Sequence, residues 1–186
     1  MRSLWPSLAS GPKGLPGVQR AVATLAFVVG GLLVVWSASI HFHLWDEPQG
    51  YRHISVIGPL FLLQAIGGLV VGVLVVAVRR VWIALAGIGY ALATAIGFLL
   101  SVGLTKGLFN FKETWLAPFA HLAFAIEVAI VVVLLAAGAL CLAGRGRGRN
   151  AVVSAPNEDR RTDRPRVKAT ASNPGRARSS RSPSDS

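Results

Sequence analysis

Apolar residues fall into four long runs along the chain, separated by short polar segments. The runs cover residues 21–40, 54–78, 81–104 and 119–143. Each has about 20–25 residues, and at about 1.5 Å of rise per residue a helix of that length crosses a hydrocarbon core of about 30 Å. The strands of a membrane barrel would alternate in polarity, and these runs do not. The pattern therefore predicts an all-α integral membrane bundle of four transmembrane helices.

Composition supports a bilayer as the solvent of these helices. Of 186 residues, 53% are hydrophobic and 15% charged, and the mean hydropathy is +0.55. A soluble domain of this length would not carry so much apolar surface. The single cysteine, Cys141, excludes a disulfide scaffold and a cysteine zinc cluster, and we expect it to face lipid.

Basic residues are unevenly distributed between the two ends of the predicted helices. One end has Arg52, Lys106 and Lys112, and the other has Arg2, Lys13, Arg20, Arg79, Arg80, Arg145, Arg147 and Arg149. The positive-inside bias predicts a plasma-membrane protein with residues 1–20 and 144–186 in the cytoplasm. The alternative that residues 21–40 form a cleaved signal peptide is less favoured, because this run exceeds the usual apolar core of about 7–15 residues.

Two segments on the predicted cytoplasmic side are strongly basic. Arg79 and Arg80 alone separate the second and third runs, which predicts a tight helical hairpin. Residues 144–186 hold 11 of the 19 Lys and Arg residues and few large apolar ones, which predicts a disordered tail. Both arginines of the hairpin, and the three arginines Arg145, Arg147 and Arg149, are expected to contact anionic lipid. Nucleic acid is not an expected partner, because the tail lacks aromatic residues for base stacking.

Small residues recur at four-residue spacing within the runs, as is typical of closely packed membrane helices. The third run has Gly89, Ala93, Gly97 and Ser101, the second has Gly68 and Gly72 after Gln64, and the first has Ala26 and Gly30. These stripes could pack within one chain, between copies in a homo-oligomer, or against another membrane protein. The sequence leaves the three open.

Five polar residues are predicted to converge in the central and outer part of the bundle: Gln64, Tyr90, Thr94, His121 and Glu127. Glu127 carries the most information, because an acidic group near the bilayer centre costs several kcal/mol unless it is neutral, paired or hydrated. It is expected to be protonated, hydrogen-bonded to a neighbouring helix, or open to a water-filled pocket. Its role is then either proton transfer or ligand binding, or a hydrogen bond that fixes helix packing.

The outer end also has candidate metal ligands, namely His41, His43, His53 and Asp46. Residues two apart on a helix point in nearly opposite directions, so His41 and His43 share an ion only if the segment is extended. Haem ligation by His41 and His121 is possible on depth alone. None of these cofactors, zinc, copper or haem, is favoured over histidines that meet water and headgroups.

The segments HFHLWDEPQGYRHISVIGPLFLLQ, from His41 to Gln64, and GLFNFKETW, from Gly107 to Trp115, resemble small four-span membrane proteins of high-GC bacteria, a group of unassigned function. The resemblance covers roughly residues 20–143. It implies a plasma-membrane location and supplies no catalytic residues.

Three functions remain open at this point. The first, which requires least of the residues, is a non-enzymatic assembly or accessory subunit. The second is a small carrier or sensor whose outward-facing polar pocket binds a proton, a metal or a small ligand. The third is a haem- or quinone-linked redox subunit. A soluble-type enzyme is not expected, because the sequence has no phosphate-binding glycine loop, HExxH or GxSxG.

Overall fold

The computed structural model describes residues 8–48 and 50–153, and in them the chain is helical. It has four long helices, α2 (Gly17–Asp46), α3 (Ile57–Val78), α4 (Val81–Gly103) and α5 (Ala120–Val153), and two short 3-10 helices, η1 (Pro12–Gly14) and η2 (Tyr51–His53). The four long helices are long and apolar enough to cross a membrane, α5 through its segment Ala120–Gly144. The predicted helical class, with four helices of membrane-crossing length and polarity, is therefore confirmed.

The ends of α2 and α5 differ from the prediction. α2 is longer than the apolar run at both ends, from Gly17 to Asp46, because the helix ends only where Pro48 approaches. α5 continues to Val153, so the structure describes residues 144–153, the start of the predicted tail, as helix. Residues 154–186 lie outside the described part of the chain.

A two-residue turn joins α3 and α4, as predicted. Arg79 ends α3 in the left-handed conformation, with φ 51° and ψ 50°, and the extended Arg80 precedes α4. The segment before α2 packs at the same end of the bundle, where the Val81 amide donates to the Ser10 carbonyl oxygen over 3.0 Å. We call this end, which holds Arg79 and Arg80, the turn end, and the opposite end, formed by residues 47–56 and 104–119, the loop end.

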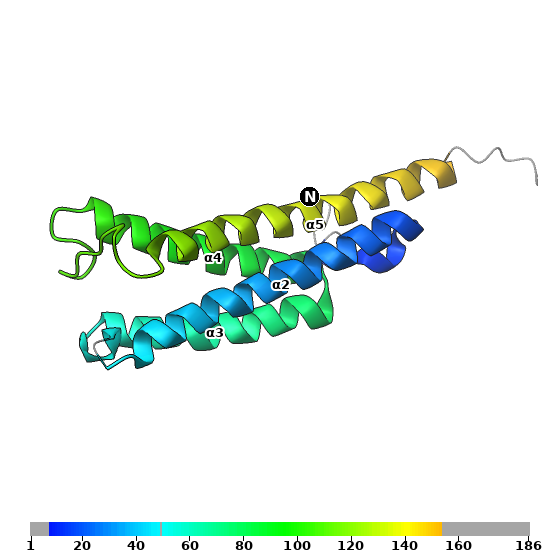
Figure 1. The fold of residues 1–186 in the computed structure, drawn as a ribbon. Helices are drawn as coiled ribbons and strands as arrows, with labels where there is room; N and C mark the ends of the chain where they lie inside the picture. The colour runs from blue at the N-terminus through cyan, green and yellow to red at the C-terminus, as the bar shows by residue number, and fades with distance from the viewer. Residues whose placement is uncertain (1–7, 49, 154–186) are drawn as a thin grey trace, which may run out of the picture. The chain divides into compact units, whose positions relative to one another are not determined.

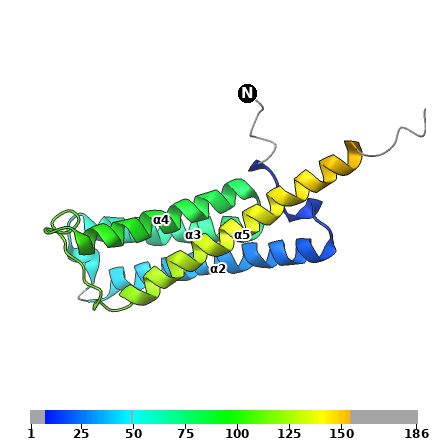
Figure 2. The same ribbon diagram turned by 90° about the horizontal axis from the view of Figure 1, so that it is seen from above.

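The helices form two pairs, α2 with α3 and α4 with α5 (Figures 1 and 2). α2 packs along both α3 and α5, whereas α3 and α4 contact each other less extensively in spite of their short connection. The core between the pairs is apolar and includes Phe27, Val34, Val75, Ile130 and Leu134. The looser contact between α3 and α4 leaves space between them toward the loop end.

Glycines allow close helix contact in α2 and α3 but not along the predicted face of α4. A Cβ on Gly30 would lie 2.4 Å from the Leu134 side chain, and one on Gly68 would lie 2.5 Å from the Tyr90 hydroxyl oxygen. At Gly89 and Gly97, a Cβ would meet nothing within 4 Å. Of the alternatives that the sequence left open for the α4 stripe, packing within the chain therefore does not apply at these two positions.

The outward surfaces of the helices are apolar. Leu25 of α2, Leu63 of α3 and Val132 of α5 are 62%, 66% and 59% exposed, and many other large aliphatic residues share this placement. Continuous apolar surface of this extent is typical of helices that face lipid. Cys141, by contrast, is buried in the core, so the expectation that it faces lipid is wrong.

Candidate functional site

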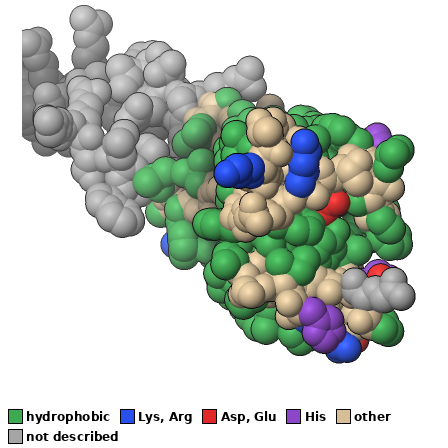
Figure 3. Space-filling view, turned by 90° about the vertical axis from the view of Figure 1, so that its left-hand side faces the viewer, with side chains coloured by type: hydrophobic (Ala, Val, Ile, Leu, Met, Phe, Trp, Pro, Cys, Tyr) green, Lys and Arg blue, Asp and Glu red, His purple; other side chains and the backbone are tan. Residues whose placement is uncertain are grey.

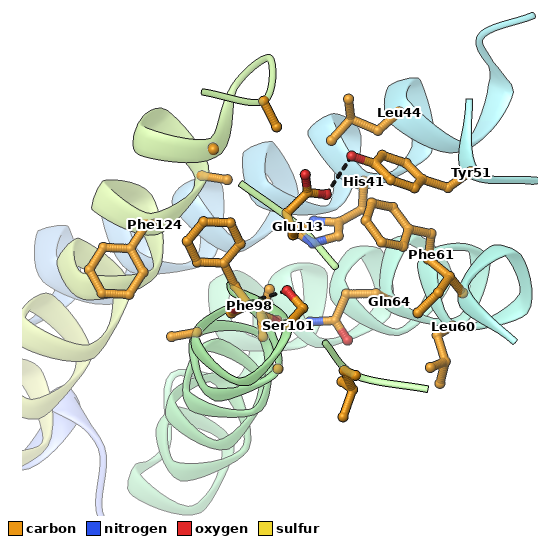
Figure 4. Close-up of a pocket in the computed structure, with 18 of the residues that line it drawn as sticks. His41, Leu44, Tyr51, Leu60, Phe61, Gln64, Phe98, Ser101, Glu113 and Phe124 are labelled. Atoms are coloured by element: carbon orange, nitrogen blue, oxygen red, sulfur yellow. Dashed lines mark hydrogen bonds between the residues drawn. The ribbon is translucent and has the colours of Figure 1, made fainter. Parts of the chain in front are cut away.

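A cavity of about 330 Å³ opens at the loop end of the bundle (Figure 4). Its walls come from the loop-end parts of α2, α3 and α4, from the first turns of α5, and from Tyr51 and the 104–119 segment. Most of the lining is aliphatic or aromatic. The polar side chains in the lining are His41, Tyr51, Gln64, Thr94, Ser101, Glu113 and Glu127.

Glu127 is the deepest acidic group of this cavity. Its side chain is 1% exposed, and its Oε1 accepts a hydrogen bond of 2.5 Å from the Ser37 hydroxyl of α2. The other carboxyl oxygen, Oε2, is buried without a partner among the described residues. A buried oxygen left without a donor costs free energy, so a donor on a bound molecule would be favourable there. Glu127 thus connects α5 to α2 through one oxygen, and its other oxygen is buried without a partner among the described residues.

Hydrogen bonds connect Glu127 to three of the four residues predicted to lie near it. The Ser37 hydroxyl is 3.4 Å from the Tyr90 hydroxyl, and the Thr94 hydroxyl donates to the Tyr90 carbonyl oxygen over 3.0 Å. Gln64 Nε2 donates to Thr94 Oγ1. The structure therefore brings Gln64, Tyr90, Thr94 and Glu127 together.

Ser37 links this group, and the sequence reasoning missed it. In sequence it lies between Trp36 and Ala38 near the end of an apolar run, and it is not singled out by the sequence analysis. A hydroxyl at this depth needs a partner, and that requirement was the available signal. Ser37 is fully buried, so its partners come from the facing helices α4 and α5.

His121 does not join the polar group. It is exposed at the start of α5, and its ring lies 5.3 Å from that of Trp115. His41, in contrast, is buried in the cavity wall. Its Nδ1 lies 2.8 Å from the Ser37 carbonyl oxygen, which only accepts, so Nδ1 is the donor. The structure therefore places His41 and His121 in different surroundings and does not bring them together as a haem pair.

The two connecting segments meet over the mouth of the cavity. The Tyr51 hydroxyl donates to Glu113 Oε2 over 2.6 Å, and the Tyr51 ring stacks on Phe61 with 4.3 Å between centroids (Figure 4). Burial, and then the hydrogen bond to Glu113, raise the pKa of the Tyr51 phenol above its ordinary value. The contact between Tyr51 and Glu113 was not predicted, because 61 residues separate the two in sequence.

The candidate metal ligands are dispersed at the loop end, where charged side chains are few (Figure 3). His43 pairs with Glu47 at 3.0 Å, and His53 accepts a hydrogen bond of 3.0 Å from Arg52. Asp46 lies 3.8 Å from Arg52. His41 and His43 lie on a continuous helix, the conformation in which they cannot share an ion. Among the described residues, no group of three His, Cys, Asp or Glu side chains is placed to hold a metal.

The structure locates the five arginines that are expected to contact anionic lipid. Arg79 and Arg80 are exposed at the turn end. Arg145, Arg147 and Arg149 lie on the last turns of α5, and their contact with anionic lipid stays a prediction. 

Comparison with known proteins gave no match: no family model, no curated protein and no solved structure is similar to this chain. The resemblance to four-span bacterial proteins therefore stays a prediction, and the function must be argued from the site itself.

Proposed function

We propose that the chain is a multi-pass plasma-membrane protein whose loop-end cavity binds a small, mainly apolar molecule. The carboxyl oxygen Oε2 of Glu127 is the polar anchor of this site. In the proposed orientation, both termini are cytoplasmic and the cavity faces outward, in agreement with the basic residues at the turn end. This is the small carrier or sensor among the three functions that the sequence left open.

The observation that carries the proposal is a cavity of about 330 Å³ whose lining includes Glu127, a residue whose buried Oε2 has no partner among the described residues. Sites for small molecules are concave, mostly apolar and supplied with a few polar groups that orient the ligand. The cavity volume lies at the lower end of the usual range of about 300–1,000 Å³. Both features support a ligand of one aromatic ring or similar size.

The site can be tested with a neutral apolar probe, isobutylbenzene, and a cationic one, protonated N,N-dimethylbenzylamine. Gly97 lines the cavity, and a Cβ there would meet nothing within 4 Å, so Gly97→Leu places a side chain in the open space. Gly89 lies two turns earlier on α4, is equally unobstructed and does not line the cavity. Gly89→Leu is therefore the matched control.

We expect at least one probe to raise the melting temperature of the full chain in lipid nanodiscs, and of the Gly89→Leu chain, but not of the Gly97→Leu chain. A ligand at about 100 times its Kd stabilises the folded state by about 2.7 kcal/mol, which such a measurement resolves. Binding of neither probe, or an equal response of the Gly97→Leu chain, would overturn the proposal.

An assembly or accessory role is the second candidate, and one observation favours it. Gly89 and Ala93 of α4 are both exposed at four-residue spacing, and a Cβ on Gly89 would meet nothing within 4 Å. Small residues of this kind permit a second helix to approach closely. Gly89→Leu would block such an approach, so a smaller cross-linked or sedimenting species for that variant would support assembly.

A further inference from the structure

We infer that the ligand of this cavity is a small hydrophobic cation, an aryl- or alkylammonium that donates its N–H to Glu127. The inference rests on the proposed function and adds the charge of the ligand to it. Three observations support it. The hydroxyl groups of the lining already donate to other groups of the protein, the lining has acidic residues but no Lys or Arg, and aromatic side chains form much of the wall.

The hydroxyl groups of the lining are occupied as donors. Tyr51 donates to Glu113, Thr94 donates to the Tyr90 carbonyl oxygen, and Ser101 donates to the Phe98 carbonyl oxygen over 2.8 Å. The buried Oε2 of Glu127, in contrast, accepts from none of the described residues. The cavity therefore offers mainly acceptors, and a ligand with a donor complements it better than one with an acceptor.

The charges in the lining have one sign. Glu127 lies in the wall and Glu113 at the mouth, whereas none of the residues in the lining is Lys or Arg. His41 uses its Nδ1 as a donor to the Ser37 carbonyl oxygen, so it does not offer that N–H to a ligand. An anionic ligand would meet two carboxyl groups without a cation to balance them, whereas a cation would meet two partners.

Aromatic rings complete the wall. Phe61, Phe98 and Phe124 line the cavity together with Phe111 and Phe119. A ring face attracts a cation, more strongly where water is excluded, and the same rings pack against the apolar part of an arylammonium. An ammonium group beside Glu127 and an apolar body among these rings would use both kinds of surface in the cavity.

The test compares two probes of nearly the same shape by titration calorimetry on the full chain in phosphatidylcholine nanodiscs, with protein-free discs subtracted. N,N-dimethylbenzylamine, protonated at pH 7, carries N–H⁺ where isobutylbenzene has C–H. We expect the wild-type chain to bind the cation at least about tenfold more tightly, a difference of about 1.4 kcal/mol. Glu127→Gln should remove that preference while isobutylbenzene still binds, which also shows that the cavity is intact.

The outcomes separate this inference from the proposed function. Equal binding of the two probes by the wild-type chain, both lost in Gly97→Leu, would overturn the cationic ligand and leave the binding site standing. A preference for the cation that persists in Glu127→Gln would overturn the role of Glu127. Binding of neither probe would overturn the proposed function together with the inference.

Discussion

Gly31 of α2 and Gly72 of α3 face each other so closely that a Cβ on either residue would lie 2.8 Å from the carbonyl oxygen of the other. Real Cβ atoms do not approach backbone oxygens at that distance, so each glycine depends on the other. The contact lies within the most extensive helix interface of the bundle. In lipid, where apolar side chains gain little by meeting, this backbone approach is a principal source of association between α2 and α3.

Replacing Gly72 with Ala should therefore separate these two helices. The added methyl group would lie 2.7 Å from the Val35 side chain and 2.8 Å from the Gly31 carbonyl oxygen. Both contacts cannot be relieved without moving a helix. We expect a loss of about 1–3 kcal/mol in the free energy of unfolding, measured by denaturation in mixed detergent micelles. Gly67→Ala, on the adjacent position of α3 where a Cβ meets nothing within 4 Å, is the control and should lose nothing. Equal stability of the two variants would contradict the role of the contact.

Removal of the Ser37 hydroxyl should also destabilise the fold. Ser37→Ala leaves Glu127 Oε1 without its 2.5 Å hydrogen bond, so that both carboxyl oxygens are buried without partners. The expected cost is about 1–3 kcal/mol in the free energy of unfolding. Ser39→Ala serves as the control, because the Ser39 hydroxyl is exposed and donates to the Trp36 carbonyl oxygen of its own helix. A Ser37→Ala chain as stable as Ser39→Ala would show that the bond does not contribute.

The sequence was sufficient to predict the four helices because the apolar runs are long and are separated by short polar segments. Arg79 and Arg80 marked the hairpin within one residue, and it is present as predicted. The ends of α2 and α5 were less predictable, because a helix can continue into polar sequence until a residue stops it. Which face of α4 packs was not predictable either, since Gly89 and Gly87 are equally small and only Gly87 is buried, with Leu134 at 2.6 Å from its Cβ position.

The depth of each residue along its helix was enough to predict which polar residues lie at the same level. The hydrogen bonds that connect them were not predicted. Distance along each helix placed Gln64, Thr94 and Glu127 at similar levels, and the structure joins them through hydrogen bonds. Which residues at that level face inward depends on the rotation of each helix about its own axis. That rotation cannot be determined from a single sequence. For this reason Ser37 was missed and His121, at an exposed position, was included.

The phenol of Tyr51 should titrate at higher pH than a free tyrosine. Its pKa is raised first by burial and then by Glu113, and ordinary tyrosine titrates near about 10. The chain has two tyrosines, so Tyr90→Phe leaves only the signal of Tyr51. We expect the tyrosinate absorbance of this variant to appear in denatured protein near pH 10 and in folded protein only at higher pH. Because the folded pKa is the higher one, the stabilisation is complete below the unfolded pKa and is lost as pH rises through the folded pKa.

Glu113→Gln in the same Tyr90→Phe background separates the two causes. The uncharged amide should lower the pKa of Tyr51 part of the way toward the ordinary value, because burial is the larger cause and remains. An unchanged titration would show that the hydrogen bond between Tyr51 and Glu113 does not persist in the membrane. A return to the ordinary value would show that burial at the mouth of the cavity is lost.

The proposed orientation of the bundle rests on the basic residues at its turn end, and single-cysteine labelling tests it. Cys141→Ala provides a cysteine-free background, and Ser55 and Thr105 are exposed positions in the two loop-end segments. We expect a membrane-impermeant maleimide to label Ser55→Cys and Thr105→Cys in intact cells and to label Ser154→Cys only after lysis, while a permeant maleimide labels all three. The reverse pattern would place the cavity on the cytoplasmic side, and labelling of only one loop-end cysteine would contradict four membrane crossings. Because a cavity at the loop end exchanges ligand with whichever compartment that end faces, this experiment decides from which side an ammonium compound would reach Glu127.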